Sequence, residues 1–474
     1  MKSYLNFKNF LAFVFFISLT ACATYYKKNL EFQEYVTHGN FQKADTWLEK
    51  DERGKDGKNK LLHYLNHGYV SWMLDDYERS NRYFSEADRI IEDYIKNYSM
   101  EALALVTNPG IKPYKPEDFE AVMLHYYTAL NYIKLHDYED ALVECRRINI
   151  RLNELNDKYK DHKNKYQRDA FAHNLMGMIY EADRDYNNAF IAYRNAYEVY
   201  KDDYSEYFNM TVPDQLKYDL LRTAYLTGFR DEVRYYEKKF GIDYQYQPNE
   251  YGEVIFFWMN GFGPVKDEWS IQFRKTAHSR DGYVTLENEE FDMSFPVYIG
   301  DKSEDEQNAF KDLRFFKVAF PKYVERKPVY QAAILQNGRQ QYSFEMAQNI
   351  NEIAFKTLQD RMLREMGTAI LRIATKKALE ALADEQDENL GTIVNLVNTM
   401  TEKADTRNWQ TLPYSIHYTR IPLKKGKNTI RLKCSSPGSS ARIHTQEYTF
   451  NGEKGKIFFQ AHHSIQTHRP QIYN

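Results

Sequence analysis

An internal repeat constrains the fold of this chain more than any other feature of its sequence. Four segments share one order: a small or apolar residue, an aromatic or small residue, a polar turn, and a second helix marked by aromatic and small residues. The marking positions are Phe32, Tyr35, Phe41, Ala44 and Leu48; Gly68, Ser71, Tyr77, Ser80, Phe84 and Ala87; Ala129, Tyr132, Tyr138, Ala141, Cys145 and Ile148; and Gly177, Tyr180, Tyr186, Ala189, Tyr193 and Ala196. A recurring helix pair of this kind predicts a solenoid.

The pattern resembles the tetratricopeptide repeat, in which two helices cross closely at Gly or Ala and aromatic side chains fill the space beside the small residue. Gly177 is expected at such a crossing. A degenerate fifth unit, whose second helix covers 231–240, is expected to cap the array. Stacked helix pairs form a concave surface that binds peptides or protein segments, so the array predicts a binding scaffold. A mere spacer is the alternative.

The pattern changes after Tyr246 to short β-branched and aromatic runs, which are typical of strands. The expected strands cover 252–258, 269–273, 283–286, 316–320, 329–335, 340–344, 415–420, 429–434, 441–450 and 456–459. The run 260–264 is expected to break the first strand, and Asn337-Gly338 is a hairpin turn signal. Helical periodicity at about 345–403 predicts a helical insert packed on the strands, with a helix lying on a membrane as the alternative.

The expected fold class is therefore an α + β multidomain chain. A tetratricopeptide-like α-solenoid at 22–245 is followed by a β-rich domain at 250–474, whose regularly spaced short strands suggest a sandwich.

A short leader precedes the repeats. Lys2 and Lys8 flank its start, and the apolar run 10–19 is too short to span a bilayer, which is typical of a secretory signal. The stretch Leu19-Thr20-Ala21-Cys22 resembles the bacterial lipobox. That resemblance implies a signal peptide at 1–21, acylation of Cys22 with chains such as palmitate, and a stable membrane anchor. An ordinary cleaved signal with a chance cysteine is the alternative. No acidic cluster follows Cys22, so we expect the outer membrane, facing the periplasm.

The search for chemistry finds no zinc-protease, P-loop or nucleophile-elbow motif and no metal-binding cysteine pair, so no catalytic residue, metal or cofactor is predicted. The adjacent His462 and His463 are expected on opposite faces of a strand. The net charge of −3 gives no field that would favour nucleic acid.

Asp405, Arg407 and Trp409 form a dense polar and aromatic group. They could make a ligand or partner site, with Arg407 as a bidentate donor and Trp409 as an anchor. The alternative, which we favour, is a structural corner in which Asp405 and Arg407 satisfy each other or the backbone and Trp409 lies in the core. Lys266, beside the glycine-rich run 260–264, is a weaker candidate for binding.

The D-T-R-x-W-x-x-L-P stretch at 405–413, together with the leader and the repeats, resembles an uncharacterised family of bacterial lipoproteins with tetratricopeptide repeats. The resemblance carries over no catalytic residue and implies an envelope role linked to peptidoglycan or outer-membrane maintenance. The expected function is a lipid-anchored cell-envelope scaffold or adaptor that binds protein partners and no nucleic acid. The alternative is an enzyme or glycan-binding protein that acts on envelope polymers through the C-terminal domain.

Overall fold

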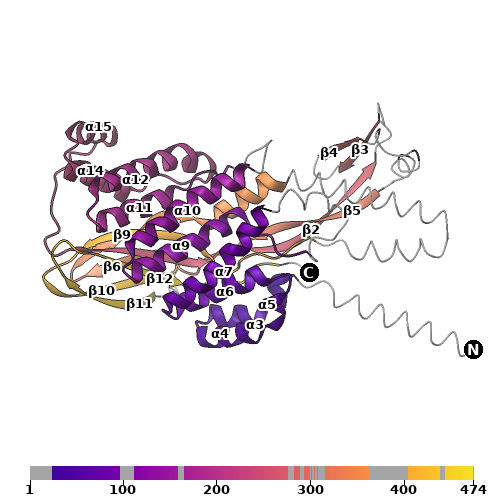
Figure 1. Ribbon diagram of the computed structural model, residues 1–474, viewed down its shortest axis with the longest axis horizontal. Helices are drawn as coiled ribbons and strands as arrows, with labels where there is room; N and C mark the ends of the chain where they lie inside the picture. The colour runs from indigo at the N-terminus through magenta and orange to yellow at the C-terminus, as the bar shows by residue number, and fades with distance from the viewer. Residues whose placement is uncertain are drawn as a thin grey trace, which may run out of the picture.

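The computed structural model describes residues 24–96, 112–157, 165–275, 282–288, 293–298, 300, 304, 307, 315–362, 404–437 and 443–472. Helices occupy the N-terminal part of the chain and strands follow from Glu253 (Figure 1). The helices stack as an array on one side of the strands. The expected leader and Cys22 lie outside the described residues.

Five helix pairs form the array, as the repeat pattern predicts. They are α3 (Leu30–Thr37) with α4 (Phe41–Lys50), α6 (Lys60–Met73) with α7 (Tyr77–Lys96), α9 (Asp118–Lys134) with α10 (Tyr138–Asp157), α11 (Ala170–Ala182) with α12 (Tyr186–Val199), and α14 (Asp214–Thr227) with α15 (Arg230–Phe240). The short helices α2 (Tyr25–Lys28), α5 (Glu52–Asp56) and α13 (Ser205–Tyr207) and a π-helical turn, η2 (Tyr200–Tyr204), connect them.

The turns between paired helices repeat one backbone geometry. Gly39, Asp75, His136 and Arg184 occupy equivalent positions and all have positive φ, between 58° and 72°. The next residue is an aspartate in three of these turns, and its side chain accepts a backbone N–H from the first turn of the second helix. This capping satisfies an amide that the helix itself leaves unpaired. The turn therefore ends one helix and starts the next.

Close helix crossings occur at the predicted glycines. A Cβ added at Gly68 would lie 2.5 Å from the Phe84 ring, and one added at Gly177 would overlap the Tyr193 ring. The expectation for Gly177 is confirmed: its missing side chain is what admits the aromatic ring of the paired helix.

The strands form three four-stranded sheets. The first has the order β12 (Ile457–Ser464), β1 (Glu253–Phe262), β9 (Pro413–Pro422), β8 (Glu345–Asn349). The second has the order β11 (Ile443–Gly452), β10 (Gly426–Ser435), β6 (Ala332–Asn337), β7 (Gln340–Ser343). The third has the order β4 (Met293–Tyr298), β3 (Tyr283–Asn288), β2 (Val265–Lys275), β5 (Phe315–Val324).

The first sheet is the middle layer of the molecule, and β1 is buried along its whole length. Because side chains alternate along a strand, Ile255, Phe257 and Met259 join the core of the helical array. Val254, Phe256 and Trp258 pack instead against Leu335, Ile430 and Leu432 of the second sheet. The expected sandwich is present, and the helices cover its outer side.

Two local expectations are wrong. The first strand does not break at Asn260: β1 continues to Phe262 in register with β9. The expected helical insert also begins later, since Glu345–Asn349 forms β8 and pairs with β9 before a helix at 350–362. Strand pairing with β9 outweighs the local helical period there. The rest of the expected insert, 363–403, lies outside the described residues.

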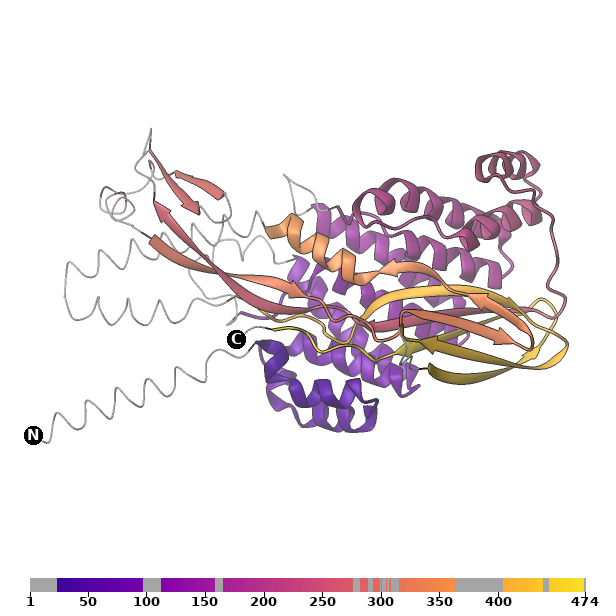
Figure 2. The same cartoon turned by 180° about the vertical axis from the view of Figure 1, so that it is seen from behind.

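The third sheet leaves the body as a ribbon. β2 follows β1 after two residues and pairs with β5 along ten register positions, from Val265↔Val324 to Arg274↔Phe315. Figure 2 shows this ribbon extending away from the helices, with β3 and β4 at its far end.

Candidate functional site

The inner face of the helical array, where solenoids commonly bind partners, is covered by the chain's own first sheet. The Tyr69 hydroxyl of α6 lies 3.0 Å from His463 Nδ1 in β12. The Lys134 Nζ of α9 donates to the Phe459 carbonyl at 3.1 Å. Phe171 of α11 packs on Phe257 of β1, with ring centroids 5.9 Å apart. The face that the sequence marks as a binding surface is therefore occupied from within the molecule.

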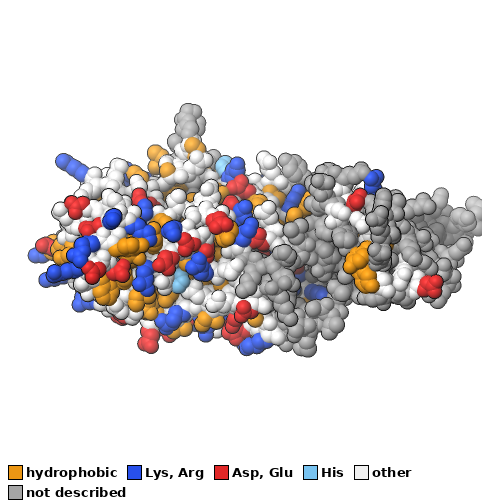
Figure 3. Space-filling model, turned by 90° about the horizontal axis from the view of Figure 1, so that it is seen from above, with side chains coloured by type: hydrophobic (Ala, Val, Ile, Leu, Met, Phe, Trp, Pro, Cys, Tyr) orange, Lys and Arg blue, Asp and Glu red, His pale blue; other side chains and the backbone are white. Residues whose placement is uncertain are grey.

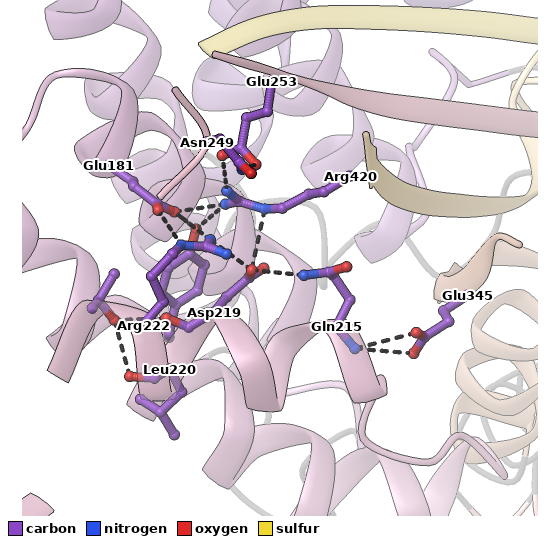
Figure 4. A network of polar contacts seen from close by, with 11 residues as sticks. Glu181, Gln215, Asp219, Leu220, Arg222, Asn249, Glu253, Glu345 and Arg420 are labelled. Carbon is purple, nitrogen blue, oxygen red and sulfur yellow. Dashed lines mark hydrogen bonds and ion pairs between the residues drawn. The ribbon is translucent and has the colours of Figure 1, made fainter. Parts of the chain in front are cut away.

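A buried ion network joins the fourth and fifth helix pairs to the sheet (Figure 4). The Arg420 guanidinium of β9 donates to Glu253 Oε1 at 2.6 Å and to Glu181 Oε2 at 2.7 Å, and its Nε lies 3.2 Å from Asp219 Oδ1. Arg222 of α14 donates to Glu181 at 2.6 Å and to Asp219 at 2.7 Å. Three carboxylates thus surround two guanidinium groups.

Each guanidinium group of this network is stabilised by carboxylates, and the carboxylates by guanidinium groups. Burial opposes ionisation of Glu181, but Arg222 and Arg420 outweigh it and lower its pKa to about 2. Burial likewise opposes the charge of Arg420, yet its carboxylate partners raise its pKa. Both guanidinium groups form ion pairs with carboxylates within the protein, so the network fixes the helices on the sheet.

Asp405, Arg407 and Trp409 also hold the two halves together. Arg407 donates to Asp405 through Nε at 2.8 Å and through Nη2 at 2.6 Å, and to the Lys58 carbonyl at 3.1 Å. Trp409 is 1% exposed, and its ring centroid lies 5.8 Å from those of Phe84 and Tyr127 in the helical array. These contacts are those that a structural corner would make: Trp409 lies in the core, and Arg407 is bonded to Asp405 and to the backbone of Lys58.

Lys266 is buried in β2 and forms an ion pair with Glu117, which also pairs with Arg361 at 2.8 Å. Beside them, Glu120 accepts from the Trp409 backbone amide at 2.6 Å and from the Tyr114 hydroxyl. Burial and the neighbouring Glu117 raise the pKa of Glu120 to about 7. Lys266 is therefore an internal partner of the first turn of α9.

A cavity of about 220 Å³ opens where α6 and α9 meet the edge strand β12. Its walls are largely aromatic and aliphatic, including Trp72, Leu130, Ile133 and Phe459, and Lys134 supplies one cation. Burial lowers the pKa of Lys134. The lining also contains two polar pairs: the Tyr448 hydroxyl lies 2.7 Å from His462 Nδ1, and the Tyr77 hydroxyl donates to Asp75 at 2.6 Å.

The described histidines and cysteines do not form a metal site. His462 contacts the Tyr448 hydroxyl at 2.7 Å, whereas His463 contacts Tyr69, so the two rings point to opposite faces of β12 as expected. Cys145 and Cys434 are buried thiols. Within the described residues no group of three His, Cys, Asp or Glu side chains could hold a metal ion. Across the same ranges, every helix is too short or too polar to cross a bilayer.

Two features of the exposed surface bear on binding: its charge and its exposed aromatic side chains. Acidic and basic side chains are interspersed over most of the coloured part of the face seen in Figure 3. The fifth helix pair, by contrast, exposes four aromatic side chains: Tyr218, Tyr225, Phe229 and Tyr235, each between 37% and 54% exposed. We call these four residues the fifth-pair aromatics.

The buried ion network was not predicted from the sequence. Its one available signal is that Arg420 follows Ile416 and Tyr418 on one face of a predicted strand. A charge at a core position requires a partner, but the spacing alone does not say which one.

Comparison with known proteins matches no family model and no curated sequence. Among solved structures, the chain is similar over 44% of its length to MamA (15% identity, 90% of that chain, TM-score 0.27) and to the apo form of RapI (16% identity, 68% of that chain, TM-score 0.30). It is similar over 45% of its length to the tetratricopeptide-like repeats of a kinesin light chain from Podosopora anserina (10% identity, 92% of that chain, TM-score 0.29).

Proposed function

We propose that this protein is a lipid-anchored scaffold of the bacterial cell envelope that binds protein partners through its helical repeats. Its anchor is Cys22, acylated after removal of residues 1–21, and its body faces the periplasm from the outer membrane. Two features support this: the Leu19-Thr20-Ala21-Cys22 stretch after a short apolar run, and an array of five helix pairs. We propose that its partners maintain peptidoglycan or the outer membrane.

The first sheet covers the inner face of the helical array and so limits where partners can bind. Because the first sheet occupies that face, partners have only the outer helices and the two ends of the array. The fifth-pair aromatics lie at one of these ends, and aromatic side chains are enriched at protein interfaces. Phe229 packs on the buried ring of Phe190 and Tyr225 on the partly buried ring of Tyr246, at centroid distances of 5.4 and 5.0 Å. They therefore form a firm surface, and we assign partner binding to it.

Affinity capture tests this assignment. The full-length acylated protein is cross-linked in cells and purified from detergent-solubilised envelopes, beside a Tyr225→Ser/Tyr235→Ser variant. The control carries Tyr283→Ser/Tyr298→Ser, the same change at exposed tyrosines of β3 and β4. We expect the first variant alone to lose its cross-linked partners. Equal capture by both variants would contradict the assignment, and release of soluble fragments from purified peptidoglycan would favour the enzyme alternative.

A further inference from the structure

The described chain is fixed to the folded body from its first residues. Thr24 is 8% exposed, and its side chain accepts the backbone N–H of Lys27. The backbone N–H of Tyr25 donates to Thr406 Oγ1 at 3.0 Å, across 381 positions of sequence. The Tyr25 ring packs against the main hydrophobic core. These contacts hold α2 directly against the folded body.

The covalent chain sets how far a lipid on Cys22 can be from this point. Only Ala23 separates Cys22 from Thr24. Consecutive Cα atoms are about 3.8 Å apart, so the Cα atoms of Cys22 and Thr24 are at most about 8 Å apart, whatever path Ala23 takes. Acyl chains buried in a bilayer would therefore hold the surface around α2 at the level of the lipid headgroups.

The surface around α2 suits an anionic bilayer. Lys28 and Lys58 are both exposed. The Lys58 carbonyl accepts from Arg407 at 3.1 Å, next to Thr406, the acceptor of the Tyr25 backbone N–H, so Lys58 lies beside α2. Of the neighbouring carboxylates, Asp405 is paired with Arg407, and Asp51, whose charge acts on Tyr25, accepts the backbone N–H of Gly54 at 3.1 Å. Leu30, at the start of α3, is 43% exposed. Lysine side chains near an anionic membrane are attracted to its headgroups.

From this geometry we infer that the surface formed by α2, Leu30 and Lys58, here named the α2 face, lies against anionic phospholipid headgroups. The inference rests on the proposed acylation of Cys22 and adds the orientation of the body. In Figures 1 and 2, α3 and α15 lie at different ends of the helical array. When the α2 face lies on the membrane, the fifth-pair aromatics at the other end of the array therefore face the periplasm, where protein partners can reach them.

Fluorescence quenching tests the orientation. The acylated full-length protein is reconstituted into vesicles of phosphatidylethanolamine and phosphatidylglycerol whose headgroups carry a nitroxide quencher. A fluorophore is attached at Lys28→Cys or Lys58→Cys, and at the control Lys238→Cys on α15; all three lysines are exposed, and the native Cys145 and Cys434 are buried. An unchanged melting temperature establishes that each variant is folded.

We expect several-fold stronger quenching at positions 28 and 58 than at position 238. Equal quenching at all three positions, or stronger quenching at 238, with Cys22 still labelled by a radioactive fatty acid, would overturn the orientation and leave the anchor intact. An absence of acyl label on Cys22 would overturn the anchor, and the orientation with it.

Discussion

The Tyr69 hydroxyl of the second helix pair lies 3.0 Å from Nδ1 of His463 in the last strand, across 394 positions of sequence. His463 Nε2 is 2.7 Å from the Gly261 carbonyl, which can only accept. The proton is therefore on Nε2, and Nδ1 accepts from Tyr69. Burial lowers the pKa of His463 to about 4, so the ring is neutral at physiological pH. Hydrogen bonds between uncharged groups thus connect Tyr69 in α6 to His463 in β12, and His463 to Gly261 near the end of β1.

Arg420→Met should destabilise the protein by about 3–5 kcal/mol, the cost of leaving buried charges without their partner. It would leave Glu181, Asp219 and Glu253 with Arg222 as the remaining guanidinium in the network. Chemical denaturation measures the change in the free energy of unfolding. The matched control is Arg431→Met, which breaks an exposed pair with Glu447 and should cost no more than about 1 kcal/mol. Equal losses would contradict a structural role for the network.

Gly177→Ala should destabilise the protein by about 1–3 kcal/mol, because the added methyl group overpacks the helix crossing at Tyr193. Thermal unfolding reports the loss. Asn187→Ala, at an exposed position on α12, serves as the control and should leave the melting temperature nearly unchanged. A variant at Gly177 as stable as the parent would show that the two helices can separate without penalty.

The stability of the protein should depend on Glu120 between pH 5 and 8. Burial and Glu117 raise the folded-state pKa of Glu120 to about 7, above its usual value of 4.5. The folded state therefore binds this proton more tightly, and the stabilisation is full below about pH 4.5 and lost as the pH rises through about 7. Glu120→Gln, which mimics the protonated acid, should reduce the fall in melting temperature from about pH 5 to about pH 8. An identical fall in both proteins would refute this.

Cys22→Ala should abolish acyl labelling and leave the protein as unprocessed precursor or release it from the membrane. The reason is that the cysteine thiol is the proposed site of lipid attachment. Metabolic labelling with a fatty acid and fractionation of envelopes measure both effects. Cys145→Ala, a change at a buried thiol, is the control and should stay labelled. Unchanged labelling of the Cys22 variant would exclude it as the anchor.

Local signals in the sequence were sufficient for much of the fold. In each helix pair the small residue and the aromatic residue lie within one short segment of the sequence. Gly68 and Gly177 contact the rings that this spacing predicts. The Asn337-Gly338 turn likewise joins β6 and β7 with Gly338 at φ 63°. In each case the deciding contact lies within one helix pair or one hairpin.

Contacts between distant segments could not be predicted in this way. The residues 345–349 carry a helical period, yet pairing with β9 makes them a strand. The Arg420–Glu181 pair spans 239 positions. The periodicity of the helices also predicts that their inner faces are apolar, but it does not identify what covers them. The sequence therefore predicted a surface open to partners, whereas the first sheet covers it.

The central claim is that the helices and the sheets form one body, and Trp409 tests it most directly because it comes from the strand-rich half and lies among helix residues Phe84 and Tyr127. Trp409→Ala should reduce stability by about 3–5 kcal/mol, the usual cost of removing a buried large aromatic side chain. Thermal unfolding is followed by far-ultraviolet circular dichroism for the helices and, for the sheets, by a fluorophore attached at Ile443→Cys, an exposed position of β11. We predict that both signals shift together in a single transition. A shift in one signal with the other unchanged would contradict the claim.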